Sequence, residues 1–61
     1  MYEKYVALRD KNGYTDYGVA KETGIPASTF SEWKNGKYEP KLEKLRKIAD
    51  LFGVNVSYFV G

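Results

Sequence analysis

The chain has 61 residues, with ten Lys or Arg against eight Asp or Glu and a formal net charge of +2. This length limits it to one small domain, residues 1–61. It contains neither cysteine nor histidine, which excludes disulfides, thiolate metal sites and histidine-based acid–base catalysis. The acidic residues form no metal-binding or paired-carboxylate pattern, so we expect neither an enzyme nor a bound cofactor or metal.

No apolar run approaches the ~20 residues that span a bilayer, and residues 1–4 lack the pattern of a signal peptide. The sequence therefore predicts a cytoplasmic protein without membrane contact. The charge is unevenly distributed, because residues 34–47 hold six basic and two acidic residues, whereas residues 1–33 hold four basic and five acidic. This asymmetry indicates either a polyanionic partner or a solvated helix face, and charge alone favours the solvated face.

Glycine and capping residues predict two short helices in the first part of the chain. The first spans residues 2–12 and ends before Gly13, a residue type common after a helix C-terminus. Thr15 is a good N-cap for the second helix, Asp16 places negative charge in its first turn, and Gly24 ends it. The side chains expected to face inward from these two helices are Tyr5, Leu8, Val19 and Ala20.

Pro26 is tolerated just before or at a helix start, and it precedes a third predicted helix. This helix begins at residue 27 or 28 and ends at the Asn35-Gly36 turn signal. Phe30 and Trp33 lie three residues apart and form its buried side. The spacing predicts that Trp33 is a core residue rather than a stacking platform for single-stranded bases.

The fourth helix has the clearest apolar spacing of the chain. Pro40 suits its first turn and Gly53 ends it, after which Asn55 can cap a last short helix over residues 56–60. No strand alternation is sustained, so the sequence predicts an all-α domain of five helices. The positions expected in the core are Leu42, Leu45, Ile48, Ala49 and Phe52 from the fourth helix, with Val56 and Phe59 from the fifth.

The second and third helices have the spacing of a helix-turn-helix motif. Two short helices joined by a turn of three or four residues can cross steeply, so that the second enters the DNA major groove while the first lies against the phosphate backbone. Ala20 is small where the helices approach, and Gly24 permits an unusual backbone conformation at the turn. Ile25 and Phe30 are apolar residues that hold the crossing angle from inside. Together they predict a DNA-reading unit over residues 15–36.

Residues 15–36, followed by Pro40 and the Leu-x-x-Leu-x-x-Ile-Ala pattern of residues 42–49, resemble the Cro and phage-repressor family of helix-turn-helix proteins, often called XRE-like. The resemblance covers nearly the whole chain and implies a compact, five-helix, lambda-repressor-like DNA-binding domain. It implies sequence-specific binding of double-stranded DNA through the major groove by a phage or bacterial transcriptional regulator. Repression is the commoner outcome in this family, whose members usually act as homodimers on two operator half-sites.

The resemblance also implies three sets of site residues. The start of the third helix faces base edges, where hydroxyl and carboxylate groups can read donors and acceptors. The starts and ends of the two motif helices lie near phosphates, and the C-terminal end of the chain forms the dimer surface. The base-reading set is Ala27, Ser28, Thr29 and Glu32. The phosphate set from the resemblance is Thr15, Asp16, Asn35 and Lys37. The ammonium group of Lys34 and the hydroxyl groups of Tyr17 and Tyr38 add three further candidate phosphate contacts. The dimer set is Asn55, Tyr58 and Val60.

The sequence departs from the family pattern at three positions. Family members commonly have Gln where this chain has Asp16, whose carboxylate would repel a phosphate. Many also have Gln where this chain has Ala27, so direct base reading is expected to be weak or helped by groove shape. A Glu often precedes the Asn-Gly pair and binds an Arg near the end of the first helix. Here Lys34 occupies that position, so Arg9 must find another acid or stay solvated.

Two other functions fit the same fold. The chain could be a protein-interaction adaptor whose third helix docks a partner protein, and Asp16 and Glu32 on the expected DNA face favour this alternative. An antitoxin-like module that binds both a partner protein and DNA is also compatible with the pattern. A DNA binder should lose affinity steeply as salt rises, whereas salt-insensitive or absent duplex binding would favour the adaptor.

Overall fold

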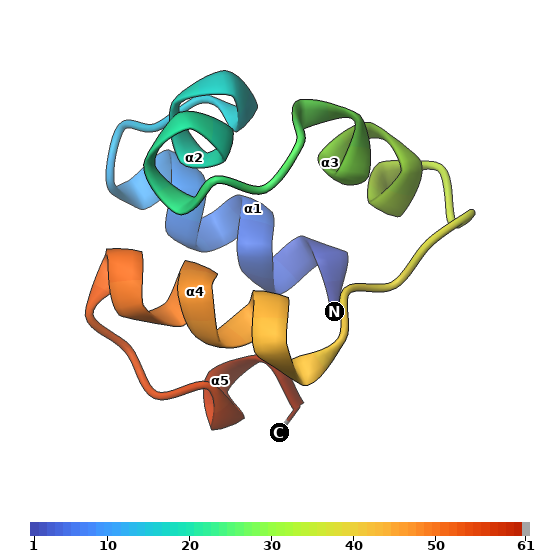
Figure 1. Cartoon of the computed structure of the whole chain (residues 1–61). Coiled ribbons are helices and arrows are strands. Elements are labelled where there is room, and N and C mark those ends of the chain that lie inside the picture. The colour runs from blue at the N-terminus through green and yellow to red at the C-terminus, as the bar shows by residue number, and fades with distance from the viewer. Residues whose placement is uncertain (61) are drawn as a thin grey trace.

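The computed structural model describes residues 1–60 and contains five helices within them (Figure 1). No strand occurs in this range, which confirms the predicted all-α fold. The same residues contain no helix that is long and apolar enough to cross a membrane. The helices are α1 (Tyr2–Lys11), α2 (Asp16–Thr23), α3 (Ala27–Lys34), α4 (Leu42–Phe52) and α5 (Ser57–Val60).

Local capping sets the boundaries of α2 as the sequence predicts. The Thr15 backbone is extended, and its Oγ1 accepts a hydrogen bond of 3.1 Å from the backbone N–H of Gly18. Gly24 has a φ of 78°, in the left-handed region, and its N–H donates to the Ala20 carbonyl at 2.9 Å. A residue with a β-carbon is strained in that conformation, so glycine ends the helix and turns the chain toward α3.

Two expected boundaries are displaced by one residue. The first helix ends at Lys11, and Asn12 follows it, with the side-chain amide donating to the Leu8 carbonyl at 2.8 Å. The last helix begins at Ser57 instead of residue 56, because the Asn55 carboxamide oxygen caps the Ser57 N–H at 2.9 Å. In both cases a side-chain amide satisfies a backbone group at the helix end.

The start of α4 differs more from the expectation. Pro40 does not lie in the first turn, because Lys41 is extended and the helix begins only at Leu42. Pro40 instead lies buried in the loop that precedes the helix. Leu42 was expected in the core but is 50% exposed, since the helical spacing places it at the edge of the apolar face of α4. The core contribution of α4 comes from Leu45, Ile48 and Ala49, with Phe52 half-buried.

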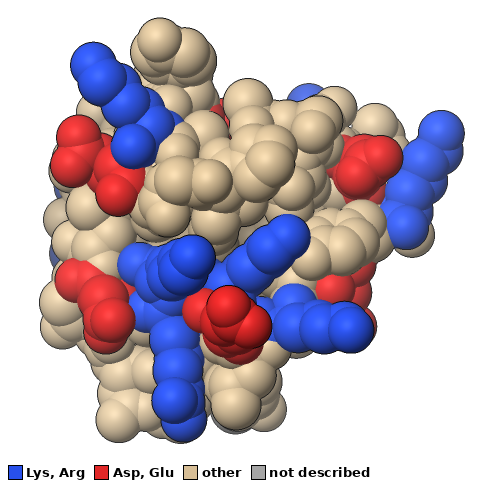
Figure 2. All heavy atoms as spheres, in the orientation of Figure 1, with Lys and Arg blue, Asp and Glu red and all other residues tan. Residues whose placement is uncertain are grey.

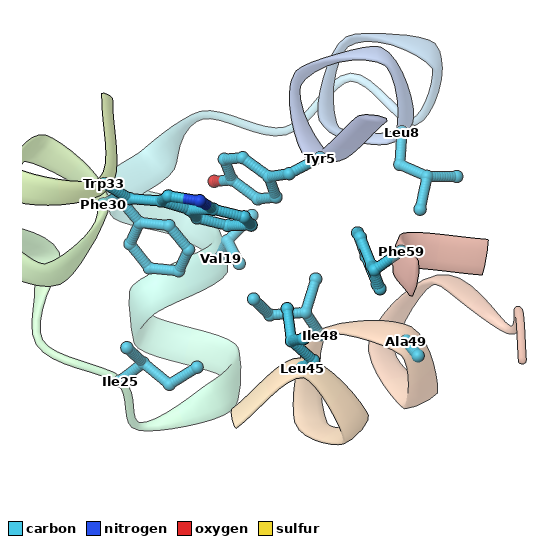
Figure 3. Close-up of a cluster of buried hydrophobic side chains, with 10 residues drawn as sticks. All are labelled: Tyr5, Leu8, Val19, Ile25, Phe30, Trp33, Leu45, Ile48, Ala49 and Phe59. Carbon is cyan, nitrogen blue, oxygen red and sulfur yellow. The ribbon is translucent and has the colours of Figure 1, made fainter. Parts of the chain in front are cut away.

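The core joins all five helices around a group of aromatic rings (Figure 3). Tyr5 of α1 is fully buried and stacks on Phe30 and Trp33 of α3, with ring centroids 5.0 and 5.2 Å apart. Trp33 is 5% exposed, which confirms that it is a core residue. Burying each such ring contributes about 1.5–3 kcal/mol, so this contact between α1 and α3 is a major support of the third helix.

The motif helices α2 and α3 lie at one end of the molecule, and α4 and α5 lie at the other (Figure 1). The turn between α2 and α3 holds Ile25, which is 3% exposed and belongs to the core. Val19 of α2 is fully buried, whereas Ala20 is half-buried against the core. The turn and both helices are therefore attached to the core from inside, which leaves their outer faces free to meet a partner.

Candidate nucleic-acid interface

The outer face of α3 carries small and polar side chains. Ala27, Ser28 and Glu32 are all exposed on it, as the sequence predicts for a reading face. Ser28 and Glu32 are four residues apart and therefore lie one above the other on the helix. Ser31 is also exposed and lies on the same side. Ser31 is absent from the predicted base-reading set, although its spacing of three residues from Ser28 indicates the same side of the helix.

Thr29 does not belong to this face. Its exposed fraction is 8%, and it is a buried polar residue at the third position of α3. The expectation that Thr29 reads base edges is therefore corrected, because its side chain is turned toward the interior. Helical spacing explains this, since Thr29 precedes Phe30 and lies four residues before Trp33, both of which are buried.

The first turn of α2 presents exposed side chains and unpaired backbone N–H groups to solvent. Tyr17 is 73% exposed, which is the largest exposed fraction of any large hydrophobic side chain in residues 1–60. Thr15 is also exposed, and its hydroxyl oxygen already accepts the Gly18 N–H. The first N–H groups of a helix lack partners within it and carry partial positive charge, which favours a nearby anion.

The Asp16 carboxylate is turned inward and tied to α1. Its Oδ1 accepts a hydrogen bond of 2.6 Å from the Tyr5 hydroxyl and another of 3.0 Å from Arg9 Nη1. Arg9 also pairs with Asp10, whose Oδ1 lies 2.9 Å from Nη2. Arg9 thus finds another acid, one of the two alternatives for it. The Asp16 carboxylate, which would repel a phosphate, is turned away from the exposed side of α2. Only the backbone N–H of Asp16 stays a candidate contact.

The pKa values of both Tyr5 and Arg9 are raised, and contacts with Asp16 contribute to both shifts. Burial, together with the hydrogen bond to Asp16, raises the pKa of the Tyr5 hydroxyl well above its ordinary range. The hydrogen bond to Asp16 raises the pKa of the Arg9 guanidinium further, so that it keeps its charge. Tyr5 therefore stays a neutral donor and Arg9 a cation beside the same carboxylate oxygen.

The C-terminal end of α3 and the loop after it carry three exposed polar side chains, Lys34, Asn35 and Lys37. Gly36 has a φ of 74°, and the Lys37 N–H donates to the Glu32 carbonyl at 2.9 Å, which fixes the loop against the helix end. Within residues 1–60 neither lysine forms an ion pair. Their ammonium groups are therefore available to an external anion.

Tyr38 is half-buried, and Lys44 Nζ lies 5.4 Å from the centroid of its ring.

The basic segment of the sequence, residues 34–47, divides into two parts in the structure. Lys34 ends α3 and Lys37 lies in the loop after it, whereas the remaining basic residues lie in α4 or, for Lys41, directly before it. Figure 2 shows Lys and Arg side chains gathered over α4 with carboxylates among them, an arrangement typical of a solvated helix face.

The expected dimer residues lie on the C-terminal part of the chain. Asn55 is exposed, but its side-chain oxygen caps α5. Tyr58 and Val60 are 38% and 63% exposed, and the Tyr58 hydroxyl lies 3.5 Å from the Lys4 carbonyl oxygen.

In the part of the chain that the structure describes, no cluster of His, Cys, Asp and Glu could hold a metal ion.

Comparison with known proteins agrees with this geometry. Residues 7–59 match the family model described as helix-turn-helix. The chain is 35% identical over 57 residues to an uncharacterized HTH-type transcriptional regulator of Haemophilus influenzae, a match that covers 92% of the chain but 23% of that protein. It is 34% identical over 56 residues to an uncharacterized HTH-type transcriptional regulator of Methanocaldococcus jannaschii, covering 92% of the chain and 85% of that protein. No solved structure matches the chain.

Proposed function

The chain belongs to the XRE-type helix-turn-helix family of transcriptional regulators, and we propose that it binds double-stranded DNA through the major groove and represses transcription. As a phage or bacterial regulator it would act in the cytoplasm, where the DNA lies. No enzymatic step, cofactor or metal is part of this function.

The observation that carries the proposal is the outer face of α3. Ala27, Ser28 and Glu32 are exposed on a helix whose opposite side is packed against Tyr5 through Phe30. A helix supported in this way can enter the major groove without bending. There Ser28 can donate to or accept from base edges, Glu32 can accept from cytosine N4, and the Ala27 methyl can touch thymine.

Affinity that does not depend on sequence comes from groups at the two ends of this face. The first turn of α2, with Thr15 and Tyr17, meets one phosphate through backbone N–H groups and the tyrosine hydroxyl. Lys34, Asn35 and Lys37 meet the backbone beyond the other end of α3. Tyr38 is a further phosphate contact in this proposal, from the same loop.

The protein acts as a homodimer on two operator half-sites, about 34 Å apart along the DNA. Exposed side chains at the C-terminal end support this arrangement, because Tyr58 and Val60 lie outside the core. Asn55 completes the proposed dimer surface beside them. The proposed dimer surface includes the exposed part of α4. A second copy would then cover the exposed apolar side chains of Tyr58, Val60 and Leu42.

An adaptor or antitoxin-like module is the second candidate function. Its support is the carboxylate of Glu32, which is exposed in the middle of the proposed reading face. The inward orientation of Asp16 removes the other acid that favoured this alternative. A partner protein would be recognised through the same outer face of α3, so the two functions compete for one surface.

Selection of bound sequences from random duplex DNA tests the proposal. Enrichment of a short motif, repeated as two half-sites one helical turn apart, is the expected result. A pool that stays random after repeated rounds, with no retention of any duplex at low salt, would overturn the DNA-binding function and favour the adaptor.

A further inference from the structure

The cluster of Tyr5, Arg9 and Asp16 lies at the first turn of α2, where the proposed function puts a phosphate. We propose that Arg9 is a positioning residue for DNA binding, which holds the Asp16 carboxylate inward and compensates its charge so that a phosphate can approach α2. This inference rests on the proposed function and assigns a role in it to a residue of α1.

The geometry of the carboxylate supports this role. Both the Tyr5 hydroxyl and Arg9 Nη1 donate to the same oxygen, Oδ1, at 2.6 and 3.0 Å. The two donors come from α1, so they draw the side chain away from the exposed side of α2 on which Tyr17 lies. The Arg9 side chain is 20% exposed and that of Asp16 37%, so the pair is partly shielded from water and salt.

The local charge shows why Arg9 is needed. Within residues 1–60, Arg9 is the one cation paired with two carboxylates, those of Asp10 and Asp16. With Arg9 present, this group of three side chains has a net charge of −1. Without Arg9 the net charge becomes −2, next to a helix start that must accept a phosphate. The carboxylate would then repel the phosphate and would also lose one of the two donors that hold it inward.

Two departures from the family pattern, at positions 16 and 34, explain why Arg9 pairs with Asp16. Lys34 stands where the family often has a Glu that binds this arginine, so the arginine is released from α3. Asp16 stands where the family commonly has Gln, and the released arginine binds it at 3.0 Å. Together, the two departures let one arginine of α1 compensate the acid at the start of α2.

A series of charge-neutralising variants of the intact chain tests the inference. The probe is a mixed-sequence duplex of about 20 base pairs, two helical turns, with affinity measured at low salt for each variant. Arg9→Gln removes the cation, Asp16→Asn removes the carboxylate but keeps an oxygen acceptor for Tyr5, and a double variant combines both changes. Arg9→Lys retains the charge, and Lys4→Gln is the matched control that removes one cation from α1 away from Asp16.

We expect Arg9→Gln to weaken duplex binding about three- to tenfold, because an uncompensated carboxylate then faces the phosphate. Adding Asp16→Asn should restore affinity to within about twofold of the parent chain, and Arg9→Lys and Lys4→Gln should stay within the same about twofold limit. Thermal unfolding of each variant separates this effect from stability, since the double variant should bind well without regaining the lost ion pair.

Two results would overturn the inference while leaving the proposed function intact. One is a parent chain that binds duplex together with an Arg9→Gln variant that binds equally well. The other is a double variant as weak as Arg9→Gln, which would mean that Arg9 contacts DNA itself or only stabilises the fold. A parent chain that binds no duplex at all would overturn the proposed function and this inference with it.

Discussion

The ring of Tyr5 stacks on the ring of Phe30 with centroids 5.0 Å apart and planes inclined by 21°. This contact joins α1 directly to the inner side of α3. The same tyrosine reaches the first turn of α2 through its hydroxyl, which donates to Asp16. One side chain of α1 thus supports both helices of the motif, so its loss should affect stability and DNA binding together.

Two substitutions at Tyr5 should distinguish the contribution of its ring to stability from that of its hydroxyl group. Tyr5→Ala should lower the free energy of unfolding by about 3–5 kcal/mol, because it leaves a cavity among fully buried rings. That loss is comparable to the whole stability of a domain this small. Tyr5→Phe keeps the ring and should cost only about 1.5–3 kcal/mol, the value of a hydrogen bond to a charged group. Urea unfolding measures both, and equal losses for the two variants would contradict this division.

Alkaline pH should destabilise the chain through the same residue. Burial and the bond to Asp16 raise the pKa of the folded Tyr5 hydroxyl above its ordinary value of 10.0. The contribution of Tyr5 to stability is therefore complete below pH 10 and is lost as pH rises beyond it, because the unfolded chain releases this proton first. The expected slope is about 1.4 kcal/mol per pH unit.

Tyr5→Phe is the control for this pH effect. Its unfolding free energy should fall less steeply above about pH 10, since the remaining alkaline loss comes only from the other titrating groups. Urea unfolding at a series of pH values compares the two chains. Parallel pH profiles would show that Tyr5 does not titrate abnormally in the folded protein.

Gly18 inside α2 and Gly24 directly after it should respond in opposite directions to substitution by alanine. Gly24 has a φ of 78°, so Gly24→Ala should lower the free energy of unfolding by about 1 kcal/mol even though a β-carbon there meets no atom within 4 Å. Gly18 has ordinary helical geometry, and a β-carbon would meet Tyr14 at an ordinary contact distance of 3.4 Å. Gly18→Ala should therefore stabilise by about 0.5–1 kcal/mol. Thermal unfolding tests the pair, and a change of the same sign at both positions would contradict it.

The local signals in the sequence were sufficient for most of the fold. Thr15 and Gly24 define α2 because capping and left-handed backbone geometry depend on the residue itself and its immediate neighbours. The same holds for Phe30 and Trp33, whose spacing identifies the buried side of α3.

The predictions that the sequence could not make correctly concern side chains whose orientation depends on helices distant in the chain. Thr29 and Leu42 lie at the borders of apolar faces, where the packing of other helices decides which residue is covered. Asp16 could be placed at a helix start from the sequence, but its pairing with Arg9 requires the relative position of α1 and α2. The signal available was the missing acid at position 34, which predicted that Arg9 needed a new partner but not which one.

Substitutions on the outer face of α3 should change which sequences are bound. Ser28→Ala and Glu32→Ala each remove a group that can bond to a base edge, and each should alter the preference for a base pair by about 1–3 kcal/mol. Affinity for unrelated duplexes should change much less, although Glu32→Ala should raise it slightly by removing a negative charge. Competition binding with selected and scrambled duplexes measures this. Thr29→Ser serves as the buried control, and a shift of base preference in that variant would contradict the orientation of α3.

Substitutions in the loop after α3 should weaken binding to all sequences equally. Lys37→Ala removes an exposed ammonium group, and it should make the negative slope of log affinity against log salt shallower by about 1. Asn35→Ala should weaken binding without changing this slope, because the amide is uncharged. Arg46→Ala on the solvated face of α4 is the comparison, expected to leave the slope nearly unchanged. A larger slope change for Arg46→Ala than for Lys37→Ala would move the phosphate contacts to α4.

The most direct test of DNA binding is the affinity of the intact chain for duplex DNA across a series of salt concentrations. Log affinity should fall linearly with log salt, with a slope of about −2 to −4 for each bound copy, as expected when a few lysines and helix-end groups meet phosphates. Absent binding at low salt, or an affinity that does not change with salt, would contradict the account and leave the outer face of α3 as a protein-docking surface.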